Sequence, residues 1–257
     1  MLEQPTYALL HELRLSGMAQ ALEEQEGVPD IQDMAFHERL ALLLEREKTE
    51  RADRRYQRLM GQARLRLQAS IEDLDFRASR GLDRSLFMRL SDCEWIRQGQ
   101  SVLISGPTGG GKTYLACALG HQACRHGLST RYYRLSRLLE ELELGRGDGS
   151  RHRILKRLAG TWLLIVDDWG LAPLDDAGRH DLLEVLDDRY GRRGTIFTSQ
   201  VPPDRWHEIV GEPTFGDAIL ERLVHNAHKI TLSGGSMRRV YDTTKGEEPE
   251  AEPETAQ

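Results

Sequence analysis

Cysteine and long apolar runs are scarce in this sequence of 257 residues. Its three cysteines, Cys93, Cys117 and Cys124, form no CxxC pair, which excludes the common zinc-binding and disulfide frameworks. We expect small buried thiols in a reducing compartment. No apolar run approaches the length of a transmembrane helix, about 20 residues, and no apolar signal segment is recognisable at the N-terminus. The sequence therefore predicts a cytoplasmic protein with no membrane partner.

Much of the net negative charge lies at the end of the chain. The net charge is -6, and five acidic residues fall in a short proline-containing segment. They are Glu247, Glu248, Glu250, Glu252 and Glu254. This composition predicts a disordered acidic tail over residues 241–257. The overall charge therefore does not exclude a nucleic-acid partner.

A glycine-rich stretch carries the clearest chemical signal. It follows a predicted strand, 101–105, and opens a predicted helix that begins with the apolar run 114–119 and stops near Gly127. The stretch consists of Gly106, Pro107, Thr108, Gly109, Gly110, Gly111, Lys112 and Thr113. Glycines let several backbone N–H groups approach a phosphate, and the helix that follows offers its positive dipole end. Lys112 would reach the β- and γ-phosphates and the Thr113 hydroxyl would ligate Mg²⁺, so we expect a nucleotide site rather than a chance glycine loop.

Two other apolar runs end in polar residues: Asp167 and Asp168 after the first, Ser199 and Gln200 after the second. Because ligands of parallel sheets bind at the carboxyl ends of strands, these side chains should converge on the glycine-rich loop. We expect Asp167 to bind Mg²⁺ through water, and Asp168 to orient or activate the attacking water. Ser199 or Gln200 would face the γ-phosphate. An Asp-Asp pair is otherwise a turn at the end of a strand, but the nearby phosphate loop favours the functional interpretation.

Predicted strands and helices alternate from residue 71 to about residue 240. This alternation predicts an α/β fold, a P-loop NTPase with a doubly wound, parallel five-stranded sheet. A strand and a helix over 130–144 precede Asp167, as in one branch of the NTPases and unlike most small-molecule kinases. Residues 1–70 have helical patterns throughout. We therefore expect a helical DNA- or partner-binding module over 1–70, the NTPase domain over 71–240 and the tail.

Arginines recur at helical spacing in the last helix of the module, predicted over residues 45–68. The arginines on one face are Arg51, Arg54, Arg55 and Arg58, continued by Arg66. Such a stripe is typical of a surface that follows DNA phosphates. The alternative is a solvated helix face balanced by acidic residues. Because these acids cluster near the start of the helix, we expect the arginines from Arg54 onward to be nearly unopposed.

Seven stretches between about residue 10 and residue 239 form a joint pattern. They are LRLSGM (13–18), IEDLDF (71–76), GPTGGGKTYLA (106–116), VDDWG (166–170), DRYGRR (188–193), TSQ (198–200) and ERLVHNAH (221–228). Together they resemble the IstB transposition-helper ATPases, relatives of the DnaC helicase loaders within the AAA+ class. Their joint occurrence is far more specific than the phosphate loop alone.

This resemblance implies an ATP-dependent homo-oligomer that binds and remodels duplex DNA with little sequence preference and delivers a DDE transposase to its target. By position, Arg222 would complete the ATP site of a neighbouring subunit; the alternative is a surface ion pair with Glu221 or Asp217. Arg238 is a candidate for a second phosphate-sensing arginine. Asp168 stands where most AAA+ members carry glutamate, which implies slow turnover.

Two other functions stay open at the level of the sequence. A replicative-helicase loader would prefer single-stranded DNA and a protein ring as its partner. A small-molecule kinase would turn over ATP without regard to DNA, and the extra strand before Asp167 disfavours it. The chain between the Arg222 helix and the acidic tail is too short for a separate helical lid, so subunit contacts would come from the sheet domain and the helical module.

Overall fold

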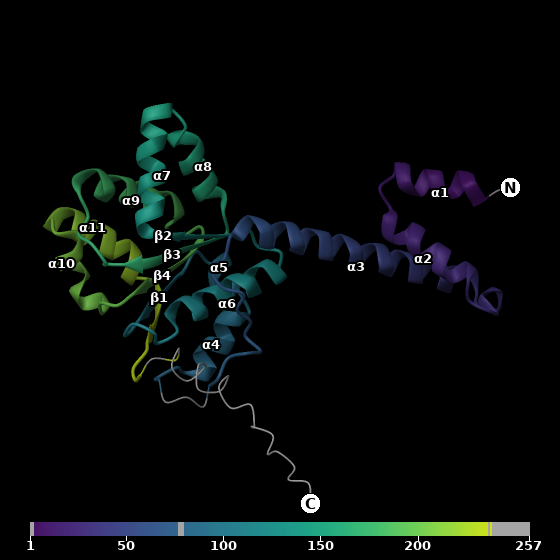
Figure 1. Cartoon of the computed structure of the whole chain (residues 1–257), viewed down its shortest axis with the longest axis horizontal. Helices are drawn as coiled ribbons and strands as arrows, with labels where there is room; N and C mark the ends of the chain where they lie inside the picture. The colour runs from purple at the N-terminus through teal and green to yellow at the C-terminus, as the bar shows by residue number, and fades with distance from the viewer. Residues whose placement is uncertain (1–2, 77–79, 236, 238–257) are drawn as a thin grey trace, which may run out of the picture. The chain divides into compact units, whose positions relative to one another are not determined.

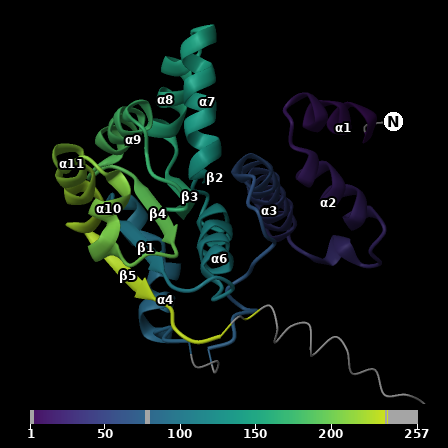
Figure 2. The ribbon, with the colours of Figure 1, turned by 60° about the vertical axis from the view of Figure 1, so that its left-hand side comes forward.

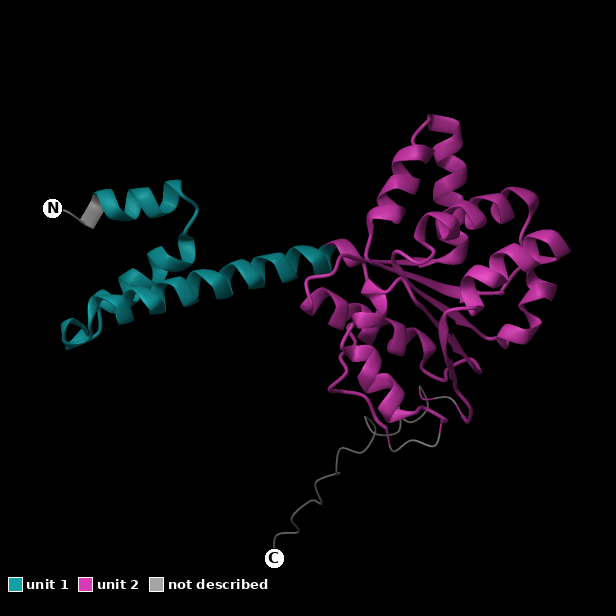
Figure 3. Ribbon diagram, turned by 180° about the vertical axis from the view of Figure 1, so that it is seen from behind, with its two compact units in different colours: residues 1–61 teal, residues 62–257 magenta. Residues whose placement is uncertain are grey.

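The computed structural model describes residues 3–76, 80–235 and 237. Arg238 and the predicted acidic tail lie outside these residues. The chain divides into two compact units, Met1–Gly61 and Gln62–Gln257, which Figure 3 colours separately. Residues 62–70, which the sequence patterns assign to the helical module, belong to the second unit.

The first unit is helical. It contains α1 (Glu3–Glu12), α2 (Ser16–Glu26), the 3₁₀ turn η1 (Ile31–Asp33) and nearly all of α3 (Phe36–Ala63). A Cβ at Gly17 would stand 2.8 Å from Glu47 Cα, so only glycine lets α2 approach α3 this closely. The buried Glu47 carboxylate accepts hydrogen bonds from the N–H groups of Gly17 (2.8 Å) and Met18 (3.2 Å). It thereby satisfies two unpaired donors at the start of α2.

Helix α3 ends at Ala63 and not at residue 68, so the predicted helix was too long. Arg64 has a φ of 50°, which is outside the right-handed helical region, and the chain turns there. The next residue, Leu65, packs on helix α6 (Lys112–Arg125), where a Cβ at Gly120 would lie 2.9 Å from Leu65 Cδ2. This packing ends the helix where its own sequence would continue it. Arg66 therefore does not continue the arginine face of α3.

The second unit contains a parallel sheet of five strands, which confirms the predicted doubly wound α/β fold. The strands are β1 (Ser101–Ser105), β2 (Thr130–Arg134), β3 (Leu163–Trp169), β4 (Gly194–Ser199) and β5 (Ala227–Thr231). Their order across the sheet is β2-β3-β4-β1-β5, and every neighbouring pair is parallel (Figure 2). The phosphate-loop strand β1 thus lies beside β4, and the extra strand β2 lies at one edge.

Helices cover both faces of this sheet (Figures 1 and 2). They are α4 (Arg84–Ser91), α5 (Glu94–Arg97), α6, α7 (Leu135–Asp148), α8 (Arg151–Gly160), α9 (Asp176–Arg189), α10 (Trp206–Val210) and α11 (Pro213–Val224), with the 3₁₀ turn η2 (Pro203–Arg205). Val102 and Ile104 belong to the core formed with α4, α5 and α6, whereas Leu103 belongs to a second core with α7 to α11. Within the described ranges, no helix is both long and apolar enough to cross a membrane.

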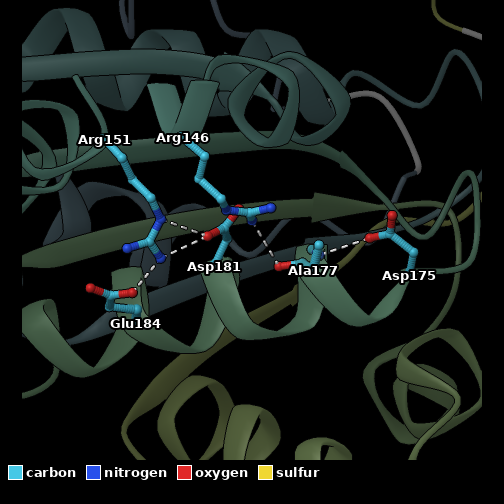
Figure 4. Close-up of polar contacts among 7 residues, drawn as sticks. Arg146, Arg151, Asp175, Ala177, Asp181 and Glu184 are labelled. Atoms are coloured by element: carbon cyan, nitrogen blue, oxygen red, sulfur yellow. Dashed lines mark hydrogen bonds and ion pairs between the residues drawn. The ribbon is translucent and has the colours of Figure 1, made fainter. Parts of the chain in front are cut away.

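A buried carboxylate ties α7 and α8 to α9 (Figure 4). Asp181 on α9 is 1% exposed and accepts hydrogen bonds from Arg151 (Nε at 3.1 Å, Nη2 at 2.8 Å) and from Arg146. Arg151 also pairs with Glu184 on the next turn of α9. Two guanidinium groups therefore compensate the charge of one buried carboxylate, which keeps the α7–α8 pair on the core that α9 covers.

Candidate functional site

The glycine-rich loop, the two acidic residues and Gln200 meet at the carboxyl edge of the sheet. β1 and β4 pair in the register Ser105↔Ser199, and β4 pairs with β3 on its other side. A pocket of about 280 Å³ lies there. Its lining includes Arg66, Leu67, Leu74, Asp75 and Arg80 before α4; Thr108, Gly109, Gly111, Lys112, Thr113 and Tyr114 around the loop; and Asp168, Gln200 and Met237.

The loop has the backbone conformation that its glycines predict. Gly106, Gly109 and Gly111 have φ values of 150°, 80° and 93°, and residues that carry a Cβ rarely adopt such positive φ values. A Cβ at Gly106 would lie 2.7 Å from the Leu232 carbonyl oxygen, so the space beside it is also closed. Gly111 stands immediately before α6, whose first N–H groups and dipole favour an anion. The loop therefore fits a bound phosphate group.

Two side chains brace the loop. The Lys112 ammonium donates to the carbonyl oxygens of Gly106 (2.8 Å) and Pro107 (2.9 Å), which places its charge across the loop. The Thr108 hydroxyl donates to Gln200 Oε1 at 2.8 Å, so the end of β4 contacts the loop directly. These hydrogen bonds hold the Lys112 ammonium, the Thr108 hydroxyl and the Gln200 amide at the pocket.

Asp167 is fully buried and receives three hydroxyl groups. Thr113 Oγ1 lies 3.0 Å and 3.2 Å from its two carboxylate oxygens, and Thr198 and Tyr132 also donate to it. Burial and the neighbouring carboxylate raise the pKa of Tyr132, so the phenol remains a donor. These contacts hold Asp167 beside the first turn of α6, as the Mg²⁺ prediction requires.

The donor set at Thr113 and Asp167 fits Mg²⁺. This ion prefers oxygen ligands and commonly takes only one or two from the protein, with water and phosphate oxygens as the others. A hydroxyl and a carboxylate that are already 3.0 Å apart match that pattern. In the described residues there is no cluster of three His, Cys, Asp or Glu side chains that could form an all-protein cage.

Asp168 has an unusual backbone and a charged environment. Its φ is 65°, and its N–H donates to Thr198 Oγ1 at 3.2 Å. Its Oδ2 lies 3.6 Å from Arg134 Nε and 3.9 Å from Arg66 Nη1. A residue other than glycine whose backbone lies in the left-handed region costs free energy, and such residues cluster at functional sites. Asp168 lines the pocket, whereas Asp167 beside it is sealed behind the three hydroxyls.

The end of β4 separates the two sensor candidates. Ser199 is fully buried, donates to the Trp169 carbonyl oxygen at 2.9 Å and accepts from the Val201 N–H at 3.0 Å. Both hydrogen bonds of the Ser199 hydroxyl therefore go to main-chain groups, at the end of β3 and just after β4. Gln200 lines the pocket and contacts the loop. The geometry favours Gln200 over Ser199 as the group that faces a bound nucleotide.

Arg222 lies away from the pocket of its own chain. It pairs with Asp187 on α9 and donates to the Ala218 carbonyl oxygen at 2.7 Å, so its ion-pair partner is neither Glu221 nor Asp217. Because Ser101 pairs with Ala227 and α11 precedes β5, Arg222 stands near the amino edge of the sheet. The phosphate loop follows the carboxyl end of β1, and the two ends of this strand are about 13 Å apart by the rise per residue. Arg222 is thus badly placed to serve its own pocket.

The arginine stripe is partly paired. All four members on α3, Arg51, Arg54, Arg55 and Arg58, are exposed. Arg51 Nε lies 2.6 Å from the buried Glu47 carboxylate, and Arg54 lies 3.0 Å from Glu50 and contacts Ser16. The expectation that Arg54 is unopposed was therefore wrong, because Glu50 stands one helical turn before it. Among the described residues Arg58 forms no ion pair.

Several residues at the pocket were not predicted. Arg80 is 5% exposed, and its Nη1 lies 2.9 Å from the position of a Cβ at Gly111. Tyr132 and Thr198 bind Asp167, and Arg66 lies beside both acidic residues although its sequence spacing indicated the DNA stripe. The IEDLDF stretch contributed to the family resemblance, but it gave no signal for these contacts.

Comparisons with known proteins identify the family of this chain. The model of the family described as IstB-like ATP binding protein matches residues 8–244. An insertion sequence ATP-binding protein of Sinorhizobium fredii is 52% identical over 93% of this chain and 98% of its own length. Another, from an insertion sequence of Pseudomonas fluorescens, is 55% identical over 79% of this chain and 88% of its own. 

A solved structure of the DnaC helicase loader has a similar fold. The TM-score is 0.51 at 17% sequence identity, over 58% of this chain and 86% of that chain. At this identity the likeness shows a shared fold and nothing about function. The ATP-binding property comes from the family match and the close relatives.

Proposed function

The chain belongs to the IstB-like ATP binding protein family, and from that premise we propose that it is a DNA-dependent, oligomeric ATPase of a transposition system. In this proposal it remodels duplex target DNA and recruits or stimulates a DDE transposase. The observation that carries the ATPase assignment is Asp168, which is turned into the phosphate-loop pocket beside Asp167 and Thr113. The names of the relatives place them in insertion sequences, which supports the transposition context.

Each residue of the pocket has a distinct task in hydrolysis. The loop from Gly106 to Thr113 cradles the phosphates, and Lys112 moves from its loop carbonyls to the β- and γ-phosphates. Mg²⁺, when bound through Thr113 and Asp167, would neutralise charge on those phosphates. Asp168 orients the attacking water, and Gln200 contacts the γ-phosphate end. Asp168 is one methylene shorter than glutamate, so we expect slow turnover.

Hydrolysis in this proposal depends on a second copy of the chain. Arg222 cannot readily serve its own pocket from the amino edge of the sheet, which supports a role at a neighbour's γ-phosphate. It would leave Asp187 to do so. An arginine supplied in this way contributes about 10³- to 10⁵-fold in rate. We also propose Arg238, which lies outside the described residues, for a second phosphate contact.

Duplex DNA would bind along the exposed arginines of α3. Each phosphate contact contributes roughly -0.9 to the slope of log affinity against log salt concentration. Arg58→Ala should therefore make the slope shallower by about one unit. Arg51→Ala should instead lower stability, because Arg51 pairs with the buried Glu47. An unchanged slope in Arg58→Ala would remove this residue from the DNA surface.

The decisive experiment for this function measures ATP hydrolysis with no DNA, with duplex DNA and with single-stranded DNA. The proposal predicts stimulation by duplex DNA that is lost in Asp168→Asn, and capture of a DDE transposase by the full chain. Stimulation by single-stranded DNA together with capture of a replicative helicase would favour a helicase loader instead. Hydrolysis indifferent to DNA would contradict both.

A further inference from the structure

The segment that follows α3 is fixed to the phosphate-loop helix. Leu65 packs on α6 at Gly120, where the absence of a Cβ makes room for it. Ala69, 4% exposed, lies in the core of the second unit. Between these two contacts the chain passes the pocket, and Arg66 and Leu67 both line it. The residues that leave α3 therefore form part of the wall of the ATP site.

Arg66 contacts both acidic residues from this segment. Its Nη1 lies 3.7 Å from Asp167 Oδ2 and 3.9 Å from Asp168 Oδ2. The same Oδ2 of Asp167 lies 3.0 Å from the Thr113 hydroxyl. The Arg66 side chain is 36% exposed, so it can leave without opening the core. A guanidinium group and a metal cation that approach the same carboxylate repel one another.

Arg134 offers an informative comparison. It approaches the same Asp168 Oδ2 at 3.6 Å, but from the end of β2. The two arginines thus place the same charge near the same carboxylate from different parts of the chain. Arg134 belongs to the sheet, whereas Arg66 follows the last residue of α3, the helix that carries the arginine stripe. Only Arg66 has a short covalent path to that helix.

We propose that Arg66 couples the ATP site to the DNA-binding helix: a nucleotide with its cation shifts Arg66 off Asp167 and Asp168, and the shift passes through residues 64–65 to α3. This inference rests on the proposed function, because it requires that α3 binds DNA. Coupling between two sites is reciprocal. ATP should therefore tighten DNA binding by the same factor by which DNA tightens ATP binding, and that factor should depend on Arg66.

The test measures equilibrium binding with the full chain. The Kd of a fluorescein-labelled duplex is measured with and without Mg²⁺ and a non-hydrolysable ATP analogue, and the Kd of the analogue with and without duplex. For the wild type we expect two equal factors, about 5-fold or greater. Arg66→Ala should bring both factors below about 2-fold, and Arg66→Lys, which keeps the charge, should retain part of the coupling. Arg134→Ala, the matched control, should keep the wild-type factor.

Two results would overturn the inference while the proposed function stands: Arg66→Ala keeps the wild-type factor, or Arg134→Ala loses as much of it. A thermal unfolding curve for each variant separates lost coupling from lost fold, and Arg66→Lys carries the test if the alanine variant unfolds. A wild-type chain that binds no duplex would instead refute the proposed function, and the inference with it.

Discussion

Replacing Gly111 by alanine should weaken ATP binding through the backbone of the phosphate loop. Gly111 has a φ of 93° directly before α6, and a Cβ there would lie 2.9 Å from Arg80 Nη1. A side chain held in such a conformation costs about 1–3 kcal/mol. Arg80 has little freedom to move aside, because it is 5% exposed and its Nη2 donates to the Asp75 carbonyl oxygen at 3.1 Å.

Any strain that the alanine loop relieves in the unbound chain must be restored when a phosphate binds, so it lowers the affinity for ATP. About 1–3 kcal/mol corresponds to a rise in the Kd for ATP of roughly 5- to 150-fold, which calorimetric titration in Mg²⁺ measures. Gly147→Ala on α7 is the control, because nothing lies within 4 Å of the added Cβ. It should leave Kd unchanged and raise the unfolding free energy by about 0.5–1 kcal/mol. If Gly111→Ala binds ATP with the wild-type Kd, the claim that phosphate binding requires glycine at this position is refuted.

Three further predictions concern stability and thiol chemistry. Gly17→Ala should lower the free energy of unfolding by about 1–3 kcal/mol in a urea titration, because its Cβ would meet Glu47 Cα at 2.8 Å. Burial alone would raise the pKa of Glu47, but hydrogen bonds from Arg51 and the α2 backbone lower it below 4.5. The ionised Glu47 carboxylate therefore stabilises the fold fully above its unfolded pKa, and this stabilisation is lost as the pH falls through its folded pKa. The difference in unfolding free energy between the wild type and Glu47→Gln should shrink below about pH 4.5. Burial raises the pKa of Cys93 to about 12 and of Cys117 to about 11, so neither should react with a thiol reagent at pH 8 until urea unfolds the chain.

The sequence was sufficient for the parts of the site whose geometry is local. The phosphate loop needs glycines at fixed places between a strand and a helix, and that requirement is visible in eight consecutive residues. The convergence of Asp167 and Gln200 on the loop follows from parallel strands that end at one edge. Both features depend on short stretches of chain and on general rules for parallel sheets.

Other parts depend on tertiary contacts that the sequence does not reveal. The helical pattern of α3 continues past Ala63, but the packing of Leu65 on Gly120 turns the chain and moves Arg66 to the pocket. Thr198 and Tyr132 reach Asp167 only because β2, β3 and β4 are neighbours in a particular register. Periodicity identifies a face of an element, and cannot state which neighbour that face will meet.

Mixing two inactive variants tests the central claim, that the ATP site is completed by a second copy of the chain. Lys112→Ala removes the phosphate contact and Arg222→Ala removes the proposed finger, so each variant alone should hydrolyse ATP at the background rate with duplex DNA. A mixed assembly contains interfaces where the intact Lys112 of one variant meets the intact Arg222 of the other. We predict that hydrolysis recovers partially and is greatest near equal proportions. Background hydrolysis at every proportion, from variants that still form mixed assemblies, would contradict the shared site.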